Sequence, residues 1–383
     1  MGVETYEVCS TPAEVAGSVQ EVFPSERSLI APNLSFDDDR LSLSDESEYP
    51  ALNVMSFKRA RVVHNSRFNT VLVANSLLIP ARIEKGPWSL YKEKKPRLVA
   101  GVKGQLENYV ALESHMNLRN LETALFIGTR APYNWYHWIA NLLPALHVAN
   151  QAAIDESIPL LLPEEIRAVP QMRESLEIFV GDRPVCWLAR NEAVEVGKLL
   201  WVDSPVYDSP FARVPTNRLP LILHLTAMRG YRKKILSHFS ADINASNPVQ
   251  RVFLARRPGS SRPYNHDKLF EPFRQKEFKP VFMEDFTFQE QVALFHGAEF
   301  IAGPSGAAFA NIMFSKPGTR ALRLVDSANP YENYFTNLAL VADLQVCDFY
   351  SHPSGANPKD SSSPLAHRRL GQATDWLLRG FDL

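Results

Sequence analysis

One histidine in this chain stands among aromatic residues at the start of a predicted helix. The segment is residues 131–146, with the sequence APYNWYHWIANLLPAL. Imidazole exchanges a proton near neutral pH, and the positive end of a helix favours its neutral form. We therefore predict that His137 is a general base that takes a proton from an attacking hydroxyl. The alternative is a buried structural histidine bonded to a backbone carbonyl.

Helical spacing divides this segment into two faces once Asn134 is taken as the helix cap. The apolar face carries Trp135, Trp138, Ile139, Leu142 and Leu146. Asn134, His137 and Asn141 follow one another on the other side, so we expect the two asparagines to line the substrate pocket beside His137. Pro144 is expected to bend the helix and to aim its first turn at a cleft.

A second group of residues has the chemistry of an anion site. Arg256 and Arg262 follow a predicted strand at 249–255, and guanidinium groups match phosphate oxygens in pairs. The sequence FIAGPSGAAFANIMF ends another strand at Gly303 and opens a helix near Gly306, where free N–H groups favour an anion. Close helix–sheet packing and a solvated basic loop are the simpler explanations of these two features.

The elements around both groups alternate between strands and helices. The predicted strands lie at 60–90, 124–128, 158–163, 184–189, 198–203, 249–255, 279–283, 299–303, 319–325 and 345–350. The predicted helices begin near Asn134 and cover 170–180, 216–239, 265–277, 288–298, 307–314 and 332–344. Strands separated by helices of this length are typical of an α/β fold with parallel sheets, whose ligands bind at the carboxyl ends of strands.

Length and composition limit the class of protein. The chain has 383 residues, which suggests two domains, and 45% hydrophobic residues. Its 41 Lys and Arg against 42 Asp and Glu give a net charge of −1, so we expect no nucleic-acid partner. Three scattered cysteines favour a reducing compartment. The sequence shows neither a secretory signal nor a membrane-spanning run, so we expect a cytoplasmic protein. Lys92, Lys94, Lys95 and Arg97 leave open a peripheral contact with an anionic membrane.

The ordered set of motifs resembles the family 61 glycosyltransferases, a group that includes bacterial capsular-polysaccharide enzymes and eukaryotic protein- and xylan-modifying enzymes. The motifs, from about residue 60 to 350, are Asn134-x-x-His137 with Leu143-Pro144, Arg256 with Arg262-x-x-Asn265, Glu290-Gln291, and Ser305-Gly306-Ala307 with Asn311 and Phe314. The chain lacks the glycine-rich signatures of dinucleotide oxidoreductases and P-loop enzymes.

The resemblance implies a GT-B-like α/β fold, in which two Rossmann-like domains with parallel sheets face a central cleft. We accordingly expect a polar extension over 1–55, an acceptor-side domain over 56–240, a nucleotide-sugar-binding domain over 241–350, and a linker with a docked helix over 351–383. The implied reaction is inverting transfer of a hexosyl or pentosyl group from a nucleoside diphosphate sugar to a hydroxyl of a glycan, a protein or a small molecule. No cofactor and no catalytic metal are implied.

The resemblance also assigns roles to individual residues. The implied base is His137. The implied donor-binding residues are Arg256, Arg262, Asn265, Glu290, Ser305, Gly306 and Ala307. The implied pocket residues are Asn134, Asn141, Tyr331 and Tyr334. The simpler role of Glu290 is a capping box with Thr287, and His296 is expected to be structural.

Two departures from the family pattern bear on activity. The family usually has His where this chain has Ser305, and Asp or Glu where it has Asn141. A serine can still cap the helix and donate to a phosphate, but an amide cannot act as a base. The alternative function is therefore a catalytically impaired relative that binds a nucleotide sugar or a glycan. A metal-dependent enzyme that uses Asp37–Asp39 is a third alternative.

Overall fold

The structure is a computed structural model with side chains. It describes residues 3–9, 12–31, 34–36, 45–64, 69–78, 104–106, 109–113, 118–128, 133–190, 192–207, 221–245, 249–257, 266–325, 334–350 and 364–379.

The chain divides into two compact units. The first comprises Met1–Ser28 and Glu48–Ala227, and the second comprises Leu29–Ser47 and Met228–Leu383. The division therefore falls at 227/228, inside helix α5 (Leu225–His238), and not at the expected 240/241. Residues 1–55, expected to be a polar extension, contribute strands to the described fold. The GT-B arrangement of two domains stays a prediction.

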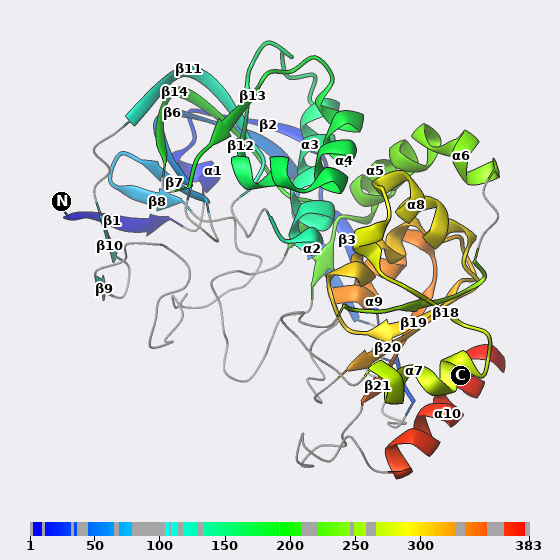
Figure 1. Ribbon diagram of the computed structural model, residues 1–383. Helices are drawn as coiled ribbons and strands as arrows, with labels where there is room; N and C mark the ends of the chain where they lie inside the picture. The colour runs from blue at the N-terminus through cyan, green and yellow to red at the C-terminus, as the bar shows by residue number, and fades with distance from the viewer. Residues whose placement is uncertain are drawn as a thin grey trace. The chain divides into compact units, whose positions relative to one another are not determined.

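The first unit is built on an eleven-stranded sheet (Figure 1). The strands run in the order β13-β12-β11-β14-β6-β7-β8-β1-β10-β9, and β2 pairs with β6. Their bounds are β1 Val3–Cys9, β2 Ser18–Phe23, β6 Leu52–His64, β7 Asn69–Val73, β8 Ser76–Leu78, β9 Gly104–Leu106, β10 Tyr109–Glu113, β11 Leu118–Phe126, β12 Leu160–Pro163, β13 Val185–Leu188 and β14 Ala193–Val202. A small antiparallel pair joins β15 (Val206–Tyr207) to β16 (Ile222–Leu223).

This sheet is mixed, which corrects the prediction of a parallel sheet in the N-terminal half. Strand β11 pairs in parallel with β12 and β14, but β14–β6, β6–β7 and β7–β8 are antiparallel. Only Ala74 and Asn75 separate β7 from β8. A connection of two residues cannot carry a chain back to start a parallel strand, so it makes a hairpin.

The helices of the first unit are α1 (Pro12–Val15), α2 (Trp135–His137), a π-helix (Trp138–Leu142), α3 (Leu143–Gln151), a 3₁₀ helix (Glu164–Ala168) and α4 (Pro170–Val180). Helix α3 packs on β14, a strand of the sheet's parallel part, whereas α1 contacts β6. Helices α3 and α4 contact each other along their length (Figure 1). The predicted helix over 216–239 is corrected, because β16 pairs at 222–223 and α5 begins only at Leu225.

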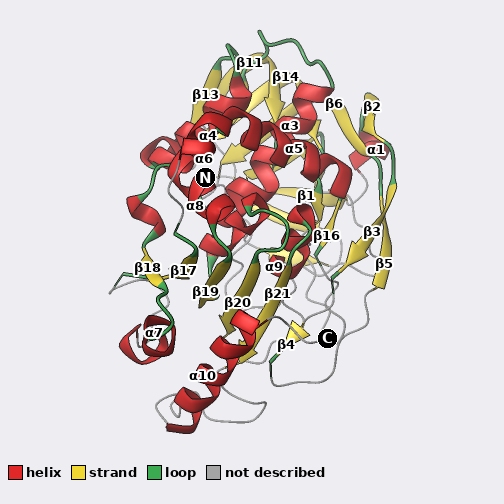
Figure 2. Cartoon of the chain, turned by 90° about the vertical axis from the view of Figure 1, so that its right-hand side faces the viewer, coloured by secondary structure: helices red, strands yellow, loops and turns green. Residues whose placement is uncertain are grey.

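The second unit has the predicted parallel sheet. Its order is β18-β17-β19-β20-β21-β4, and every pair for which a register is defined is parallel (Figure 2). The bounds are β4 Leu34–Ser35, β17 Arg251–Leu254, β18 Lys279–Val281, β19 Phe300–Pro304, β20 Arg320–Val325 and β21 Gln345–Tyr350. Strands β3 (Glu26–Ile30) and β5 (Asp45–Tyr49) form a separate pair.

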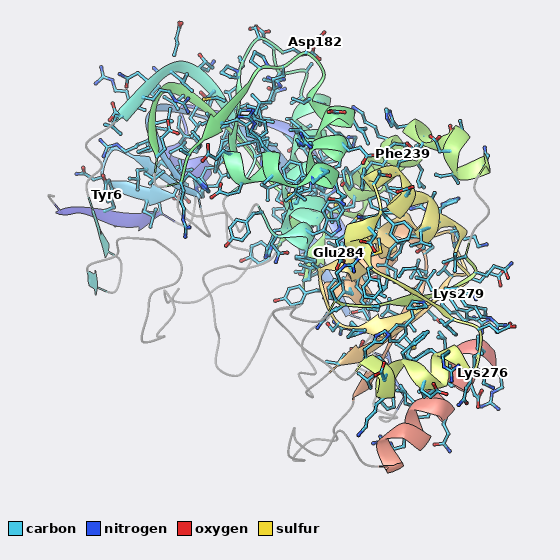
Figure 3. All side chains as sticks on the ribbon, in the orientation of Figure 1. Tyr6, Asp182, Phe239, Lys276, Lys279 and Glu284 are labelled. Atoms are coloured by element: carbon cyan, nitrogen blue, oxygen red, sulfur yellow. The ribbon has the colours of Figure 1, made fainter. Side chains whose placement is uncertain are left out.

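A helix follows each of the strands β17 to β21 of this second sheet. The helices are α6 (Ser240–Ala245), which precedes β17, α7 (His266–Arg274), α8 (Phe288–Gly297), α9 (Tyr334–Ala339) and α10 (Pro364–Arg379), with 3₁₀ helices at Met283–Asp285, Ala307–Phe314 and Leu340–Ala342. Helix α6 lies just beyond the end of the helix predicted over 216–239. The C-terminal helix α10 buries Leu370, Ala373 and Leu377 in the same core cluster as Phe253. Lys276, labelled in Figure 3, adds an ion pair to Asp375 of α10 at 2.8 Å.

Candidate functional site

The strand order of the second unit defines where a ligand is expected to bind. After β18 the chain crosses to the other side of β17 to make β19, so the direction of winding reverses between β17 and β19. In open parallel sheets, the carboxyl ends of the two strands at this reversal form the usual ligand crevice. Arg256 follows β17 and Ser305 follows β19, so both lie at this edge.

Glycine at position 303 lets the ends of β17 and β19 approach closely. Gly303 has φ of 150°, which side-chain-bearing residues rarely adopt. A β-carbon there would lie 2.6 Å from the Leu254 carbonyl oxygen, which is a clash with backbone. Because the clash is with backbone, no side-chain movement can relieve it. The close approach of β17 and β19 therefore requires glycine at position 303.

Arg256 lies across the loop that follows β19. Its Nη2 donates a hydrogen bond to the backbone carbonyl of Ser305. A β-carbon at Gly306 would lie 2.8 Å from the same nitrogen. The missing side chain at Gly306 therefore makes room for the guanidinium, and a permanent positive charge is held against the start of the next helix.

That helix, Ala307–Phe314, is 3₁₀ throughout. Its cap is Gly306 and no side chain caps it, so Ser305 does not use its capacity to cap this helix. Ser305 instead uses its backbone N–H to bond the Leu324 carbonyl at 2.8 Å. The first helical bond runs from Phe309 N–H to the Gly306 carbonyl, so Ala307 and Ala308 precede the helical ladder. Residues 304–308 are half-exposed and 309–314 are buried.

In the first unit, the aromatic residues around His137 anchor its helix. Asn134 caps the helix as predicted, accepting a hydrogen bond from the Tyr136 N–H at 3.0 Å. Trp138 is fully buried, and its Nε1 donates to Ser175 Oγ of α4 at 2.9 Å. Tyr136 is buried as well, whereas His137 is half-buried. The aromatic cluster thus fixes the helix and leaves the histidine accessible.

The polar stripe of this helix forms a connected pair. His137 Nδ1 lies 3.0 Å from Asn141 Oδ1. The Asn141 Nδ2 donates to the Val206 carbonyl at 3.5 Å, and the Asn141 carbonyl accepts from Ser204 Oγ at 3.2 Å. Ser204 and Val206 both follow β14, and the carboxyl end of β14 is level with that of β11. Asn141, predicted as a pocket residue, thus contacts the predicted base.

A π-helical stretch lies between His137 and Pro144. The N–H of Leu143 bonds to the carbonyl of Trp138, five residues earlier. Proline lacks an N–H and crowds the preceding turn, and a wide turn is one way a helix accommodates it. Pro144 then stands in the first turn of α3, where prolines are tolerated. The bend expected at Pro144 stays a prediction, and the observed feature is the π-helix just before it.

A comparison with protein-family sequence models now gives the chain its class. Residues 135–322 match the family described as Glycosyltransferase 61. This segment belongs to glycosyltransferase family 61. No curated protein matches the chain. The matched segment includes the histidine helix, Arg256 and the 305–308 loop. The family match indicates glycosyl transfer, with a sugar donor and an acceptor as substrates.

The family motif around residue 290 has a structural role in the described fold. Thr287 and Glu290 form the predicted capping box, with bonds of 2.8 and 3.2 Å between each backbone N–H and the other's side chain. Gln291 is buried and its Nε2 donates to the Met283 carbonyl at 2.9 Å, while its Oε1 accepts from Asn311 Nδ2 at 2.8 Å. This amide pair joins two motifs of the family, and the sequence analysis assigned it no function.

Arg257, the neighbour of Arg256, is used differently. It forms ion pairs with Asp285 and, at 3.4 Å, with Glu284, which is labelled in Figure 3. Its guanidinium also lies 4.8 Å from the centroid of the Phe282 ring. Adjacent side chains of an extended segment point in different directions. Of these two arginines, Arg256 therefore faces the 305–306 loop and Arg257 does not.

Of the other residues considered from the sequence, some are described by the structure and others lie outside the described residues. Tyr334 begins α9, which packs on the 307–314 helix through Phe335 and Phe309. His296 is structural, with Nδ1 3.2 Å from the Phe314 carbonyl, and burial lowers its pKa. The predicted residues Arg262, Asn265 and Tyr331, the acidic run Asp37–Asp39 and the basic run 92–97 lie outside the described residues.

Two groups of buried charges were missed by the sequence analysis. Asp203 follows β14, and its Oδ2 accepts hydrogen bonds from the backbone and side-chain amides of Asn53 at 3.0 and 3.2 Å. Burial raises the pKa of Asp203 to about 6, against the opposing effect of those bonds. Arg323 and Asp348 form a fully buried ion pair at 2.6 Å, in register with Gly303. A charged residue at an inward strand position is the signal that could have found this pair.

Membrane and metal features can be assessed for the described residues only. None of the described helices is both long and apolar enough to cross a bilayer. Within the same ranges, no three or more His, Cys, Asp and Glu side chains are grouped so that they could hold a metal ion.

Proposed function

We propose that this protein transfers a sugar from a nucleoside diphosphate sugar to a hydroxyl group, with inversion and without a catalytic metal. The single observation that carries the donor class is Arg256, held over Gly306 at the winding reversal of a parallel sheet. A fixed guanidinium beside half-exposed small residues suits a diphosphate.

In this proposal the second unit binds the leaving group. Arg256 donates to the diphosphate oxygens, and the N–H groups of Ala307 and Ala308 add further donors. As the bond from the anomeric carbon to the diphosphate oxygen breaks, negative charge grows on that oxygen. Donors fixed beforehand stabilise this charge better than water, which must reorient.

His137 supplies the proton acceptor of the proposed reaction. The acceptor hydroxyl oxygen attacks the anomeric carbon from the face opposite the diphosphate, and its proton passes to the imidazole. One displacement of this kind inverts the anomeric centre. A general base contributes roughly 10²–10⁴-fold to the rate, so His137→Ala is expected to lower kcat by that factor.

The experiment is a panel of nucleotide sugars with release of nucleoside diphosphate as the readout. The wild type is expected to release nucleoside diphosphate from at least one donor. His137→Ala is expected to bind that donor with unchanged affinity but to release nucleoside diphosphate from it far more slowly. Full activity of His137→Ala would remove the histidine from the mechanism. His147→Ala, at a buried position of helix α3, controls for loss of a histidine as such.

Asn141 and Ser305 favour a second candidate function, a binding module without catalysis. An amide at 141 cannot act as a base, and Ser305 replaces the family's usual histidine. The same panel separates the two functions. Stabilisation of the fold by a nucleotide sugar, with no diphosphate released under any condition, is the outcome expected of the module.

A further inference from the structure

We propose that Asn141 is a positioning residue that holds the His137 imidazole in the Nδ1–H tautomer, so that Nε2 carries the lone pair and not the proton. The role of that lone pair as the catalytic base rests on the proposed function. The tautomer itself does not, because it follows from hydrogen bonds within the first unit.

The orientation of the Asn141 amide decides which atom meets the histidine. Its Nδ2 faces the Val206 carbonyl oxygen at 3.5 Å, and an NH₂ group can only donate. The opposite orientation would place two carbonyl oxygens against each other. The Oδ1 must therefore face His137 Nδ1 at 3.0 Å.

The platform that holds Asn141 is itself fixed. Ser204 Oγ donates to the Asn141 backbone carbonyl at 3.2 Å and accepts from the Val206 N–H at 3.3 Å. Tyr49 Oη donates to the Ser204 carbonyl at 2.7 Å. The turn after β14 is thus bonded on both sides, so the Val206 carbonyl has a defined direction.

The contact with Asn141 determines which ring nitrogen of His137 carries the proton. Because Asn141 Oδ1 only accepts, the contact is a hydrogen bond only if Nδ1 carries the proton. In a neutral imidazole with the proton on Nδ1, Nε2 carries no proton. A carboxylate at 141 would hold the same nitrogen but would also favour the charged imidazolium, which cannot accept a proton. The amide orients the ring without adding a charge.

Other titratable groups near this turn must be separated from His137. They are Asp203 at the end of β14, Tyr49 and Tyr207, which surround the turn, and Tyr136, whose ring meets the His137 ring edge-on at 5.1 Å. Asp203 has a pKa of about 6 and is therefore the group that would be confused with a histidine. Asp203→Asn removes that titration and serves as the control background.

The first test is NMR of the full chain labelled with ¹⁵N-histidine, with His137→Ala used to assign the signal. Above the pH where His137 titrates, the wild type is expected to show a protonated Nδ1 and an unprotonated Nε2. In Asn141→Leu the signal is expected to change to a mixture or to the Nε2–H form, which is the commoner tautomer of a free histidine. An Nε2–H tautomer in the wild type would overturn the proposal, and this result does not depend on any transferase activity.

The second test is the pH dependence of kcat for the donor identified in the panel. Asn141→Asp in the Asp203→Asn background is expected to move the acidic limb of the profile upward by about 1 pH unit or more, as an opposite charge at this distance does. Asn141→Leu is expected to lower kcat by at least about 10-fold, within the range that a base contributes, with KM nearly unchanged. Profiles and kcat that stay the same in both variants would contradict a positioning role, even if the enzyme is active.

Discussion

At the residue scale, the donor site depends on one side chain being absent. Gly306→Ala would place a β-carbon 2.8 Å from the Arg256 guanidinium, and the far end of a flexible side chain can move away at small cost. We therefore expect stability to change by less than about 1 kcal/mol, while nucleoside diphosphate binding weakens by about 5- to 10-fold or more because the charge is displaced.

Calorimetric titration with nucleoside diphosphates measures this effect. Gly371→Ala is a matched control, because a β-carbon at Gly371 in α10 would meet nothing within 4 Å. Equal affinities for the two alanine variants would show that Arg256 need not rest on Gly306.

Asp203 gives a residue-scale prediction for stability. Its pKa is about 6 in the folded protein against 3.8 as the ordinary value, so the folded state binds the proton more tightly. Between these pH values the free energy of unfolding falls as pH rises, and above pH 6 the full penalty of about 3 kcal/mol applies. The penalty is absent below pH 4.

Urea denaturation of the wild type and Asp203→Asn between pH 4.5 and 8 measures this. The wild type is expected to lose stability relative to Asp203→Asn as pH rises through 6. A difference between the two proteins that does not vary with pH would show that Asp203 is not the titrating group.

At the element scale, helix α10 shows how apolar spacing predicts packing. Leu377 is fully buried against the second sheet, and its truncation to alanine is expected to cost about 2–5 kcal/mol of unfolding free energy. Gln372→Ala, at an exposed position of the same helix, is expected to change stability by less than about 0.5 kcal/mol. Thermal or urea unfolding checks both, and a small effect of Leu377→Ala would show that α10 does not stabilise the unit.

The elements that sequence periodicity predicted well are those whose pattern reflects local burial. The strands at 251–254, 300–304 and 320–325, the capped helix after Thr287, and helix α4 were all recognisable. Periodicity did not predict the antiparallel part of the first sheet, because strand direction depends on pairing partners that a sequence does not display. Nor did it separate 3₁₀ or π turns from α-helix at 307–314 and 138–142, since their side-chain spacing differs little.

Sequence also could not distinguish neighbours that share a residue type. Arg256 and Arg257 are adjacent and carry the same charge, yet one rests on Gly306 and the other pairs with Asp285. Asn141 was expected in a pocket, and its bond to His137 depends on the turn at 204–206, over 60 residues away. Helical spacing places Asn141 next to His137, but the orientation of its amide and the partners of the two arginines follow from tertiary packing.

At the scale of the whole molecule, the family segment 135–322 includes parts of both compact units. The proposed chemistry neutralises the leaving diphosphate with Arg256 and backbone amides, so turnover is expected to stay within about twofold when a chelator is added. The measurement is diphosphate release before and after chelation. Loss of activity that Mg²⁺ or Mn²⁺ restores would instead favour a metal-dependent enzyme, with Asp37–Asp39 as the first residues to substitute.

The most direct measurement is nucleoside diphosphate affinity for three forms of the full chain: wild type, Arg256→Ala and Arg257→Ala. The two variants remove the same charge from adjacent positions, so long-range electrostatics affects both alike. Arg256→Ala is expected to bind roughly 10- to 100-fold more weakly than the wild type, and Arg257→Ala within about threefold of it. Equal weakening in both variants, or none in Arg256→Ala, would contradict a diphosphate site at the β17–β19 edge.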